Sequence, residues 1–156
     1  MKKLIWLLLI LISTTPIMAQ SLDESMGESD EVRETIMKLF DGMEAADGNV
    51  LRSVLDEGAT FHTVRSSESG TELNETDMKN FIESVEESEP GSLIEEILYI
   101  SVNVDGDLAT AWMDYHFYQG VEFSHCGVNS MNLIRKNGEW KIFSIVDTRR
   151  TEGCLE

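Results

Sequence analysis

Basic residues, prolines and cysteines are all scarce in this sequence. Among its 156 residues, 12 are Lys or Arg against 29 Asp or Glu, two are Pro and two are Cys. A surface with a net charge of −17 repels phosphate backbones and anionic headgroups, which argues against a nucleic-acid-binding protein and against a basic membrane-surface helix. The 42% of apolar residues and the low Pro content argue against a disordered or fibrous chain and are typical of one ordinary globular domain.

No sequence motif for a bound metal, a nucleotide or a catalytic nucleophile is present. Cys126 and Cys154 lack CxxC spacing and the three histidines lack HxxxH spacing, so neither set predicts a metal site. GxSxG, Walker and Rossmann glycine patterns are also missing, and we expect no cofactor. The two cysteines leave a disulfide and two free thiols open as alternatives, because the sequence does not give the distance between them.

Long apolar runs are limited to the N-terminus. A nine-residue run at 4–12 follows two lysines and precedes Ala19, after which a signal peptidase could cut. The run is too short to span a bilayer, although an uncleaved anchor is the alternative. We therefore predict a signal peptide at residues 1–20, a flexible segment at 21–29, and a secreted or periplasmic protein with no membrane attachment once the leader is removed.

Helix signals dominate the first half of the chain and strand signals dominate the second. We predict helices that begin at Asp30 behind a Ser29 cap, at Val50, and after an Asn74 cap, with a strand at 59–64 and a mobile loop at 65–73. The apolar stripe of the first helix is Val32, Ile36, Leu39, Phe40 and Met43. Four strands follow, at 93–104, 108–118, 121–135 and 139–149, separated by compact turns that contain Gly. Helices that precede an antiparallel sheet predict an α+β fold in which the helices cover one face.

The acidic residues are concentrated in the predicted helical half. Residues 21–96 carry a net charge of −16, from 5 basic and 21 acidic side chains, whereas residues 97–156 carry −3, from 5 and 8. Solvated helix faces account for most such runs. A calcium site is the alternative, but no EF-hand spacing supports it. The nearly neutral sheet half is therefore the side on which we expect a ligand.

The hairpin turns predict which strand residues face one another. A two-residue turn at Gln119-Gly120 would place Asp114 opposite His125, and one at Asn137-Gly138 would place Arg150 on the other side of His125. We interpret Asp114 and His125 as a catalytic acid–base pair and Arg150 as an anion-binding residue. A cross-strand salt network that binds nothing is the alternative. A bulge near the turn would move Asp114 to the other face.

The same register supplies further ligand-binding candidates. Trp112 would lie beside Gly127, which has no side chain and so makes room for the indole, and Asn129 would lie opposite Val146. His116 would share the face of Asp114, and His62 on the first strand could reach the mouth of the pocket. The predicted ligand-binding residues are therefore His62, Trp112, His116, Asn129 and Arg150. A structural role is the alternative for His62.

Short motifs along the chain resemble the nuclear transport factor 2-like superfamily. They are, in order, Ala46-Asp47-Gly48-Asn49, Ala59-Thr60-Phe61-His62, Asp107-Leu108-Ala109-Thr110-Ala111 and Asn137-Gly138-Glu139-Trp140-Lys141-Ile142. More narrowly, Ser124-His125-Cys126-Gly127 with Asp147-Thr148-Arg149-Arg150 resembles its SnoaL-like branch, which occurs in many bacterial proteins. The resemblance covers residues 30–150 and leaves a tail at 151–156.

What the resemblance implies is a conical half-barrel, a curved antiparallel sheet wrapped around N-terminal helices with a pocket at its open end. Enzymes of this superfamily, such as ketosteroid isomerase and scytalone dehydratase, use Asp, His, Tyr or Arg in that pocket without a cofactor, and other members only bind or transport. The resemblance also implies a homodimer through the outer face of the sheet.

Three hypotheses on function follow. The first is an exported protein that binds a small apolar molecule in the cone, with enzymatic activity left open. The second is a cofactor-free acid–base enzyme, of isomerase, dehydratase or cyclase type, that uses His125 and Asp114. The third is a non-catalytic dimerisation or interaction module whose cone is filled by Trp112, Met131 and Trp140. An open cavity beside His125 would separate the first two hypotheses from the third.

Overall fold

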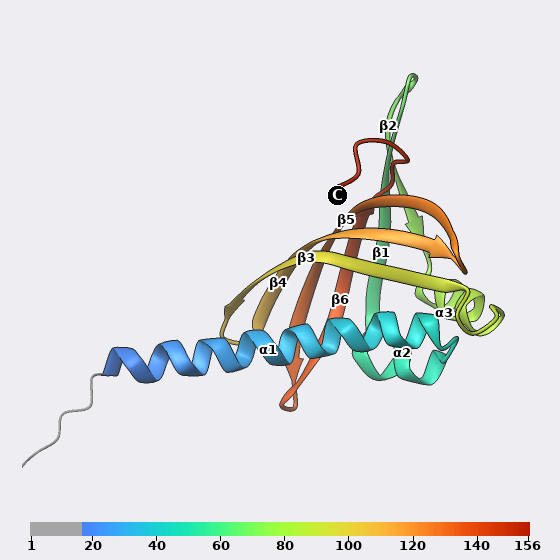
Figure 1. Ribbon diagram of the computed structural model, residues 1–156. Coiled ribbons are helices and arrows are strands. Elements are labelled where there is room, and N and C mark those ends of the chain that lie inside the picture. Colours follow the sequence, from blue (N-terminus) through green and yellow to red (C-terminus); the bar gives the residue numbers. More distant parts are fainter. Residues whose placement is uncertain (1–16) are drawn as a thin grey trace, which may run out of the picture.

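A computed structural model of the protein describes residues 17–156, and side chains from residue 27 onward. Its elements are α1 (Ile17–Glu44), α2 (Gly48–Val54), β1 (Leu55–Ser67), β2 (Gly70–Thr76), α3 (Met78–Glu86), β3 (Leu93–Asp105), β4 (Leu108–Gln119), β5 (Glu122–Lys136) and β6 (Glu139–Thr148). Residues 1–16, which hold most of the predicted signal peptide, lie outside the described residues. The helices lie against one face of the sheet (Figure 1), so the predicted α+β fold is confirmed.

The six strands form one curved, unclosed sheet in the order β2-β1-β6-β5-β4-β3. Figure 1 shows the sheet arching over α1, with α2 and α3 at one end of the arch. Every neighbouring pair is antiparallel except β1 and β6, which run parallel. The predicted half-barrel is thus confirmed, but a purely antiparallel sheet is wrong at this one pair. The reason is that α2 leads into β1 at the end of the sheet where β6 starts, with Leu55 opposite Ile142, so both strands run in the same direction.

The core lies between the concave face of the sheet and α1. All five residues of the predicted stripe on α1 are buried, from Val32 to Met43. The helix begins at Ile17, however, so the predicted start at Asp30 is wrong, and residues 21–29 belong to α1. Tertiary contacts favour this longer helix, because Glu28 forms an ion pair of 2.7 Å with Arg135 on β5. The Arg135 guanidinium in turn lies 4.6 Å from the ring centre of Trp140.

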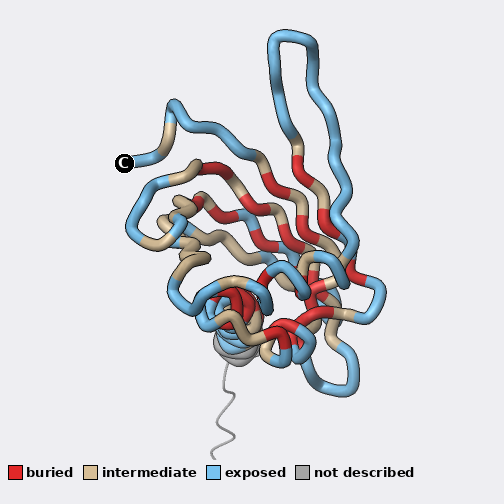
Figure 2. Tube along the Cα trace, turned by 90° about the vertical axis from the view of Figure 1, so that its right-hand side faces the viewer, coloured by how far each residue is buried: buried red, intermediate tan, exposed pale blue. Residues whose placement is uncertain are grey.

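Residues 65–73 form part of a hairpin instead of the predicted loop. β1 continues to Ser67 and pairs with β2 through a tight turn at Glu68 and Ser69, and Gly70, the first residue of β2, has a φ of +136°. The hairpin projects from the body of the molecule (Figures 1 and 2), and every residue of β2 is exposed. No apolar alternation therefore marks it in the sequence. Helix α3 is capped by Asp77, not by the predicted Asn74, since the Asp77 carboxylate accepts hydrogen bonds from two backbone N–H groups.

The four strands of the second half match their predicted bounds within one residue. Asn137 and Gly138 form the predicted two-residue turn, both with positive φ as a type I′ turn requires.

Buried residues gather where this sheet faces the helices (Figure 2), and the acidic side chains Glu83, Glu86 and Glu87 point to solvent as predicted. No helix in the range 17–156 combines the length and the apolar character needed to cross a membrane.

Candidate functional site

The pairing of β4 with β5 differs from the predicted register by three residues. The turn uses Gly120 and Val121, so Gln119 lies opposite Glu122, and a bulge at Ser124 then shifts the pairing by one more residue. His125 consequently lies opposite Phe117, whereas Asp114 lies opposite Val128. Side chains alternate between the two faces of a strand, so a register that differs by an odd number of residues places Asp114 and His125 on opposite faces of the sheet. The predicted row of Asp114, His125 and Arg150 is therefore wrong.

The pairing of β5 with β6 follows the prediction only near the turn. Leu133 lies opposite Ile142 as predicted, but Phe143 is an extra residue on β6, and Asn129 therefore lies opposite Asp147 instead of Val146. The bulge turns Asp147 toward the interior, where it is only 9% exposed. A carboxylate that sequence analysis did not select thus enters the concave face beside Asn129.

Gly127 makes room for Tyr115, not for Trp112 as predicted. Tyr115 lies directly opposite Gly127, and a Cβ atom on Gly127 would lie 2.9 Å from the Tyr115 ring and would clash with the carbonyl oxygen of Thr148. The Tyr115 hydroxyl donates a hydrogen bond of 2.9 Å to that same carbonyl. Trp112 points to the outer face and is 55% exposed. Close backbone packing at Gly127 therefore supports a buried tyrosine at the site.

A cavity of about 300 Å³ lies between the concave face and helices α1 and α3. Its apolar wall is formed by Leu39, Phe40, Met43, Phe61, Phe81, Val85, Leu93, Phe117, Met131 and Ile145. His125 also lines it, so the cone is open beside His125. Trp112 and Trp140 do not line it, which means that the filled cone of the third hypothesis is wrong.

One end of the cavity carries a buried carboxyl group, that of Glu95 on β3. Asn129 Nδ2 donates a hydrogen bond of 2.5 Å to Glu95 Oε1. Burial raises the pKa of Glu95 to about 7, against a smaller lowering by the Asn129 hydrogen bond, and the nearby Asp147 carboxylate raises the pKa further. Glu95 is therefore able to donate a proton below neutral pH and to accept one above it.

A second carboxylate, Asp147, lies in the same end of the cavity and is held by three donors. Thr63 Oγ1 donates at 2.5 Å, Arg149 Nε at 2.7 Å, and the Tyr115 hydroxyl approaches at 3.4 Å. Burial and the Asp147 charge both raise the pKa of Tyr115, so its hydroxyl stays protonated. We call Glu95, Asn129, Tyr115, Asp147 and Arg149 the polar end of the cavity.

His125 stands at the mouth of the cavity. Its ring lies 5.0 Å from the Phe117 ring centre and 5.8 Å from that of Tyr115, and Ser124 Oγ lies 3.1 Å from Nδ1. Burial lowers the pKa of His125, and the positive charge of Arg149 lowers it further, while Asp147 opposes both effects. At neutral pH the imidazole is therefore uncharged, with one nitrogen able to accept a proton or a hydrogen bond.

The structure brings some of the predicted site residues together and separates others. His125, Asn129 and His62 all line the cavity, although His62 is only partly buried and lies between Phe61 and Thr63, which are both buried. Trp112, Asp114 and His116 lie on the outer face, where His116 contacts the rings of Tyr118 and Phe123. Arg150 lines a separate groove next to His125.

Sequence analysis missed four members of the polar end: Glu95, Tyr115, Asp147 and Arg149. One signal was available for Glu95, which lies two residues from both Leu93 and Ile97 and therefore in the apolar phase of its strand. No such signal marks Asp147, because a bulge determines which way it faces. Within residues 17–156, no three His, Cys, Asp or Glu side chains come together as a metal site.

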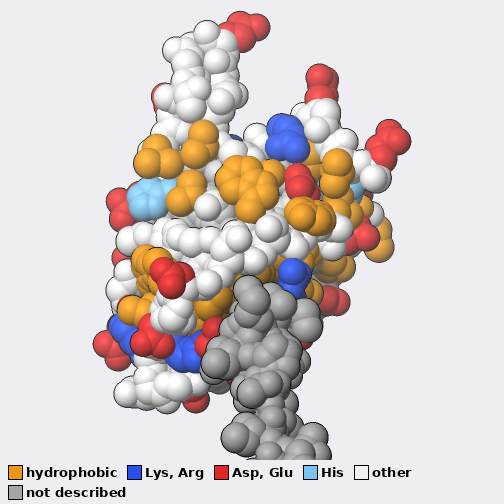
Figure 3. Space-filling model, turned by 90° about the vertical axis from the view of Figure 1, so that its left-hand side faces the viewer, with side chains coloured by type: hydrophobic (Ala, Val, Ile, Leu, Met, Phe, Trp, Pro, Cys, Tyr) orange, Lys and Arg blue, Asp and Glu red, His pale blue; other side chains and the backbone are white. Residues whose placement is uncertain are grey.

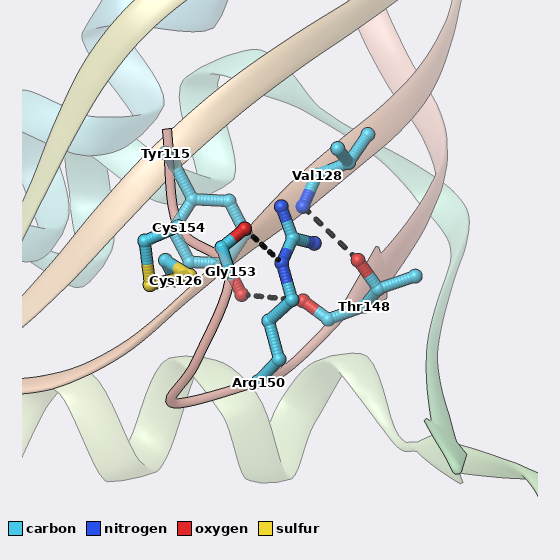
Figure 4. Close-up of a disulfide and its surroundings, with 7 residues drawn as sticks. All are labelled: Tyr115, Cys126, Val128, Thr148, Arg150, Gly153 and Cys154. Atoms are coloured by element: carbon cyan, nitrogen blue, oxygen red, sulfur yellow. Dashed lines mark hydrogen bonds between the residues drawn. A yellow bond between two sulfur atoms is a disulfide. The ribbon is translucent and has the colours of Figure 1, made fainter. Parts of the chain in front are cut away.

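Cys126 and Cys154 form a disulfide, which decides between the two alternatives left by the sequence. Cys126 lies on the outer face of β5 and ties the C-terminal tail to the sheet (Figure 4). Beside it, the backbones of Cys126 and Arg150 exchange hydrogen bonds of 2.8 and 2.9 Å. The tail is thus fixed next to the start of β5 and the end of β6, beside the groove that His125 and Arg150 line.

A curved sheet over helices, with a cavity that ends in titratable side chains, defines the nuclear transport factor 2-like class of α+β proteins. Residues 27–146 match the family model described as "Putative lumazine-binding", and the chain belongs to this family. The predicted superfamily is thereby confirmed, whereas its SnoaL-like branch stays a prediction.

Solved structures of the same class share the fold at low sequence identity. A nuclear transport factor 2-like protein with a cystatin-like fold from Novosphingobium aromaticivorans is 14% identical, with a TM-score of 0.68 over 92% of this chain and 95% of that one. A protein from Streptomyces avermitilis described as a "putative dehydratase" is 15% identical, with a TM-score of 0.61 over 80% of this chain and 97% of that one. The association domain of C. elegans CaMKII is 15% identical, with a TM-score of 0.60 over 80% and 98%. No curated protein matches the sequence.

Proposed function

We propose that the protein binds a small, largely apolar molecule in the cavity, with the polar end holding its polar edge. The single observation that carries this is an open cavity of about 300 Å³ with apolar walls and convergent polar groups at one end. Small-molecule sites are typically concave, mostly apolar and about 300–1,000 Å³ in volume, with a few polar groups that orient the ligand. The cavity lies at the small end of this range, which favours a compact ligand.

The polar end indicates which hydrogen-bonding pattern the ligand presents. Asp147 accepts hydrogen bonds, and Glu95 with its pKa of about 7 can donate or accept at neutral pH. A planar heterocycle with alternating N–H and C=O groups complements such a pair. Lumazine, a pteridine dione of this kind, is named in the description of the matching family, which supports it as the first ligand to test.

Titration with lumazine, followed by its own fluorescence, tests the proposal. We expect one molecule bound per chain, with binding lost in Ser84→Trp, because Ser84 lines the cavity from α3 and an indole there occupies its space. Ser88→Trp, in the turn after α3 and away from the cavity lining, is the matched control and is expected to bind like the wild type. The neutral apolar probe N-phenyl-1-naphthylamine is tested in the same way. If lumazine and this probe both fail to bind, or if both bind Ser84→Trp as tightly as the wild type, the proposal is wrong.

Acid–base catalysis is the second candidate function, and the pKa of Glu95 is the observation that favours it. A general base works best when its pKa lies near the working pH, and Glu95 at about 7 meets this condition inside an apolar cavity. In this proposal Glu95 replaces Asp114 as the carboxyl partner, with His125 at the mouth as the second proton carrier.

A generic proton-transfer probe tests that activity without knowledge of the substrate. In 5-nitrobenzisoxazole, removal of the ring C–H proton by a base breaks the N–O bond and releases a coloured phenolate. We expect the rate to rise with pH through about 7 as Glu95 ionises, and to fall by about 10²-fold or more in Glu95→Gln. An equal rate in Asp114→Asn is the control, since Asp114 lies on the outer face. A rate that is unchanged in Glu95→Gln would exclude Glu95 as the base.

We further propose that two copies of the chain pair through the outer face of the sheet. Tyr99, Trp112 and Phe123 are 57%, 55% and 44% exposed on strands β3, β4 and β5. Hydrophobic side chains form a band across the face of the molecule seen in Figure 3, and exposed apolar patches of this kind often mark interfaces. Light scattering tests the pairing: Trp112→Arg is expected to shift a dimer to monomers, and a monomeric wild type would contradict it.

We also propose that the protein acts outside the cytoplasm. The leader-like start of the sequence and the disulfide both support this, because disulfides persist in oxidising compartments. The mass of the protein isolated from its own cells tests it: a chain that starts near Gln20 is expected, and a full-length intracellular chain would contradict it.

A further inference from the structure

A second, wider groove lies next to the mouth of the cavity and contains three arginines. Its volume is about 640 Å³, and it is lined by Arg65 from β1 together with Arg149 and Arg150, which follow β6. His125, Phe117 and Arg149 line both spaces, so the groove adjoins the cavity at these residues. We call the wider space the arginine groove. A ligand that extends from the cavity past His125 would reach it.

The charge pattern of the protein singles out this groove. Ten Lys and Arg lie within residues 17–156, and seven of them form ion pairs with a carboxylate. Among these described residues, the three without such a pair are Arg33, Arg65 and Arg150. Arg33, on α1, donates a hydrogen bond of 3.2 Å to the carbonyl oxygen of Ile100 on β3 and does not line the groove. The other two line the same groove.

The third arginine also keeps donors available. Arg149 meets Asp147 through Nε alone, so this ion pair does not engage the two terminal nitrogens of the guanidinium. The positive charges of Arg149 and Arg65 both lower the pKa of His125, in addition to the effect of burial, which places both charges near the mouth of the cavity. Glu152 is the one acidic residue among those that line the groove. A net positive groove thus exists on a strongly acidic protein.

The position of Arg150 is held by the disulfide and the tail around it. Arg150 Nε donates a hydrogen bond of 3.2 Å to the carbonyl oxygen of Gly153, next to Cys154 (Figure 4). The backbone N–H and C=O groups of Arg150 are both hydrogen-bonded to the backbone of Cys126. Side chains that are held before a ligand arrives lose less conformational entropy on binding.

We propose that the arginine groove binds an anionic group, a carboxylate or a phosphate, on the same ligand whose apolar or ring part fills the cavity. Guanidinium groups bind both anions through paired hydrogen bonds, and three of them line the groove that adjoins the cavity at His125 and Phe117. This inference rests on the proposed function, because it assigns a second part to the ligand of the same cavity. The ligand class is an amphiphilic anion with a compact apolar or heterocyclic body.

Two fluorescent probes with one skeleton test the proposal. N-phenyl-1-naphthylamine is neutral, and 8-anilino-1-naphthalenesulfonate is the same skeleton with one anionic group. We expect the sulfonate to bind about tenfold more tightly than the neutral probe, as two or more charge-assisted hydrogen bonds would produce. In Arg65→Gln/Arg150→Gln this advantage is expected to disappear, while the affinity for the neutral probe stays unchanged.

The matched control is Arg33→Gln/Lys79→Gln. It also removes two positive charges, but from residues that do not line the groove. Both probes are expected to bind it as they bind the wild type. If the groove variant and this control weaken the sulfonate equally, only net charge matters and the proposal is wrong. If the neutral probe binds, and loses binding in Ser84→Trp, but the sulfonate binds no more tightly, then the cavity function stands and the groove inference fails.

Competition distinguishes the two anions. 1-Naphthylacetate and 1-naphthyl phosphate are each added to the bound sulfonate probe, with 1-naphthol as the neutral reference. Displacement by the carboxylate at lower concentration indicates a carboxylate ligand, and displacement by the phosphate at lower concentration indicates a phosphate ligand. If neither competes better than 1-naphthol, the groove does not recognise anions and the proposal is overturned.

Discussion

The two faces of strands β4 and β5 carry similar residue types but in opposite surroundings. On the concave face, Tyr115, His125 and Asn129 lie against a cavity, and their neighbour Glu95 has a pKa raised to about 7 by burial. On the outer face, Trp112 and His116 lie among exposed aromatic side chains, and the disulfide holds the tail. The difference teaches that burial, more than residue type, decides which side chains have a shifted pKa here.

Removal of the disulfide has the largest expected effect, and it separates the outer face from the cavity. Cys126→Ser/Cys154→Ser opens a link between residues 28 apart, which should lower the free energy of unfolding by about 3–4 kcal/mol in urea titrations. At low temperature, where the variant stays folded, we expect weaker binding of the sulfonate probe and unchanged binding of the neutral one. Equal losses for both probes would show that the tail supports the whole site and not the groove alone.

Gly127→Ala acts on the concave face and is expected to be nearly as destabilising. The added methyl group would clash with the Thr148 carbonyl and press on the Tyr115 ring, which should cost about 3 kcal/mol of unfolding free energy. Gly58→Ala is the matched control, since a Cβ there meets nothing closer than 3.9 Å. Similar stability of the two variants would contradict the close packing between β5 and β6.

Glu95→Gln should change how stability depends on pH. Glu95 has a pKa of about 7 in the folded protein and an ordinary value near 4.5 when unfolded, so folding favours its protonated form. Below pH about 4.5, Glu95 is protonated in both the folded and the unfolded protein, and the pKa difference does not affect stability. As pH rises from there through about 7, Glu95 ionises first in the unfolded protein, so the folded protein loses stability. Relative to the wild type, Glu95→Gln should gain about 2–3 kcal/mol between these limits. A constant difference across that range would contradict the raised pKa.

Asp114→Asn is expected to have the smallest effect and so sharpens the comparison of the two faces. Because Asp114 lies on the outer face, the affinity for the neutral probe and the pH profile of proton transfer should match those of the wild type within about twofold. Asn129→Leu, one residue beyond the position opposite Asp114 but on the concave face, should reduce binding of lumazine about tenfold, since it removes the partner of Glu95. Equal effects of both substitutions would contradict the assignment of faces.

Much of the fold was predictable from local patterns. The apolar stripe of α1, the four strand bounds of the second half and the Asn137-Gly138 turn follow from periodicity and turn chemistry, and the structure confirms them. The polar hairpin of β1 and β2 was not predictable, because none of its outer residues is buried. The early part of α1 was missed because its contact partner, Arg135, lies more than a hundred residues away in the chain.

The candidate site was predictable only in part. Sequence analysis selected His125 and Asn129, which line the cavity, but it paired them with Asp114 and Val146, which do not. It assigned anion binding to Arg150 on a register that is wrong, and we propose the same role on the different neighbours that the arginine groove supplies.

By itself, the sequence determined the apolar stripe of α1, the bounds of strands β3 to β6 and the acidic character of the helical half, because these depend on local spacing and composition. Only the tertiary structure decided which side chains share the cavity. Two bulges, at Ser124 and Phe143, set the final register of β5 against its neighbours. One extra residue reverses the face of every side chain beyond it, and the packing of the whole sheet on the helices, not the turn residues, determines where that residue goes.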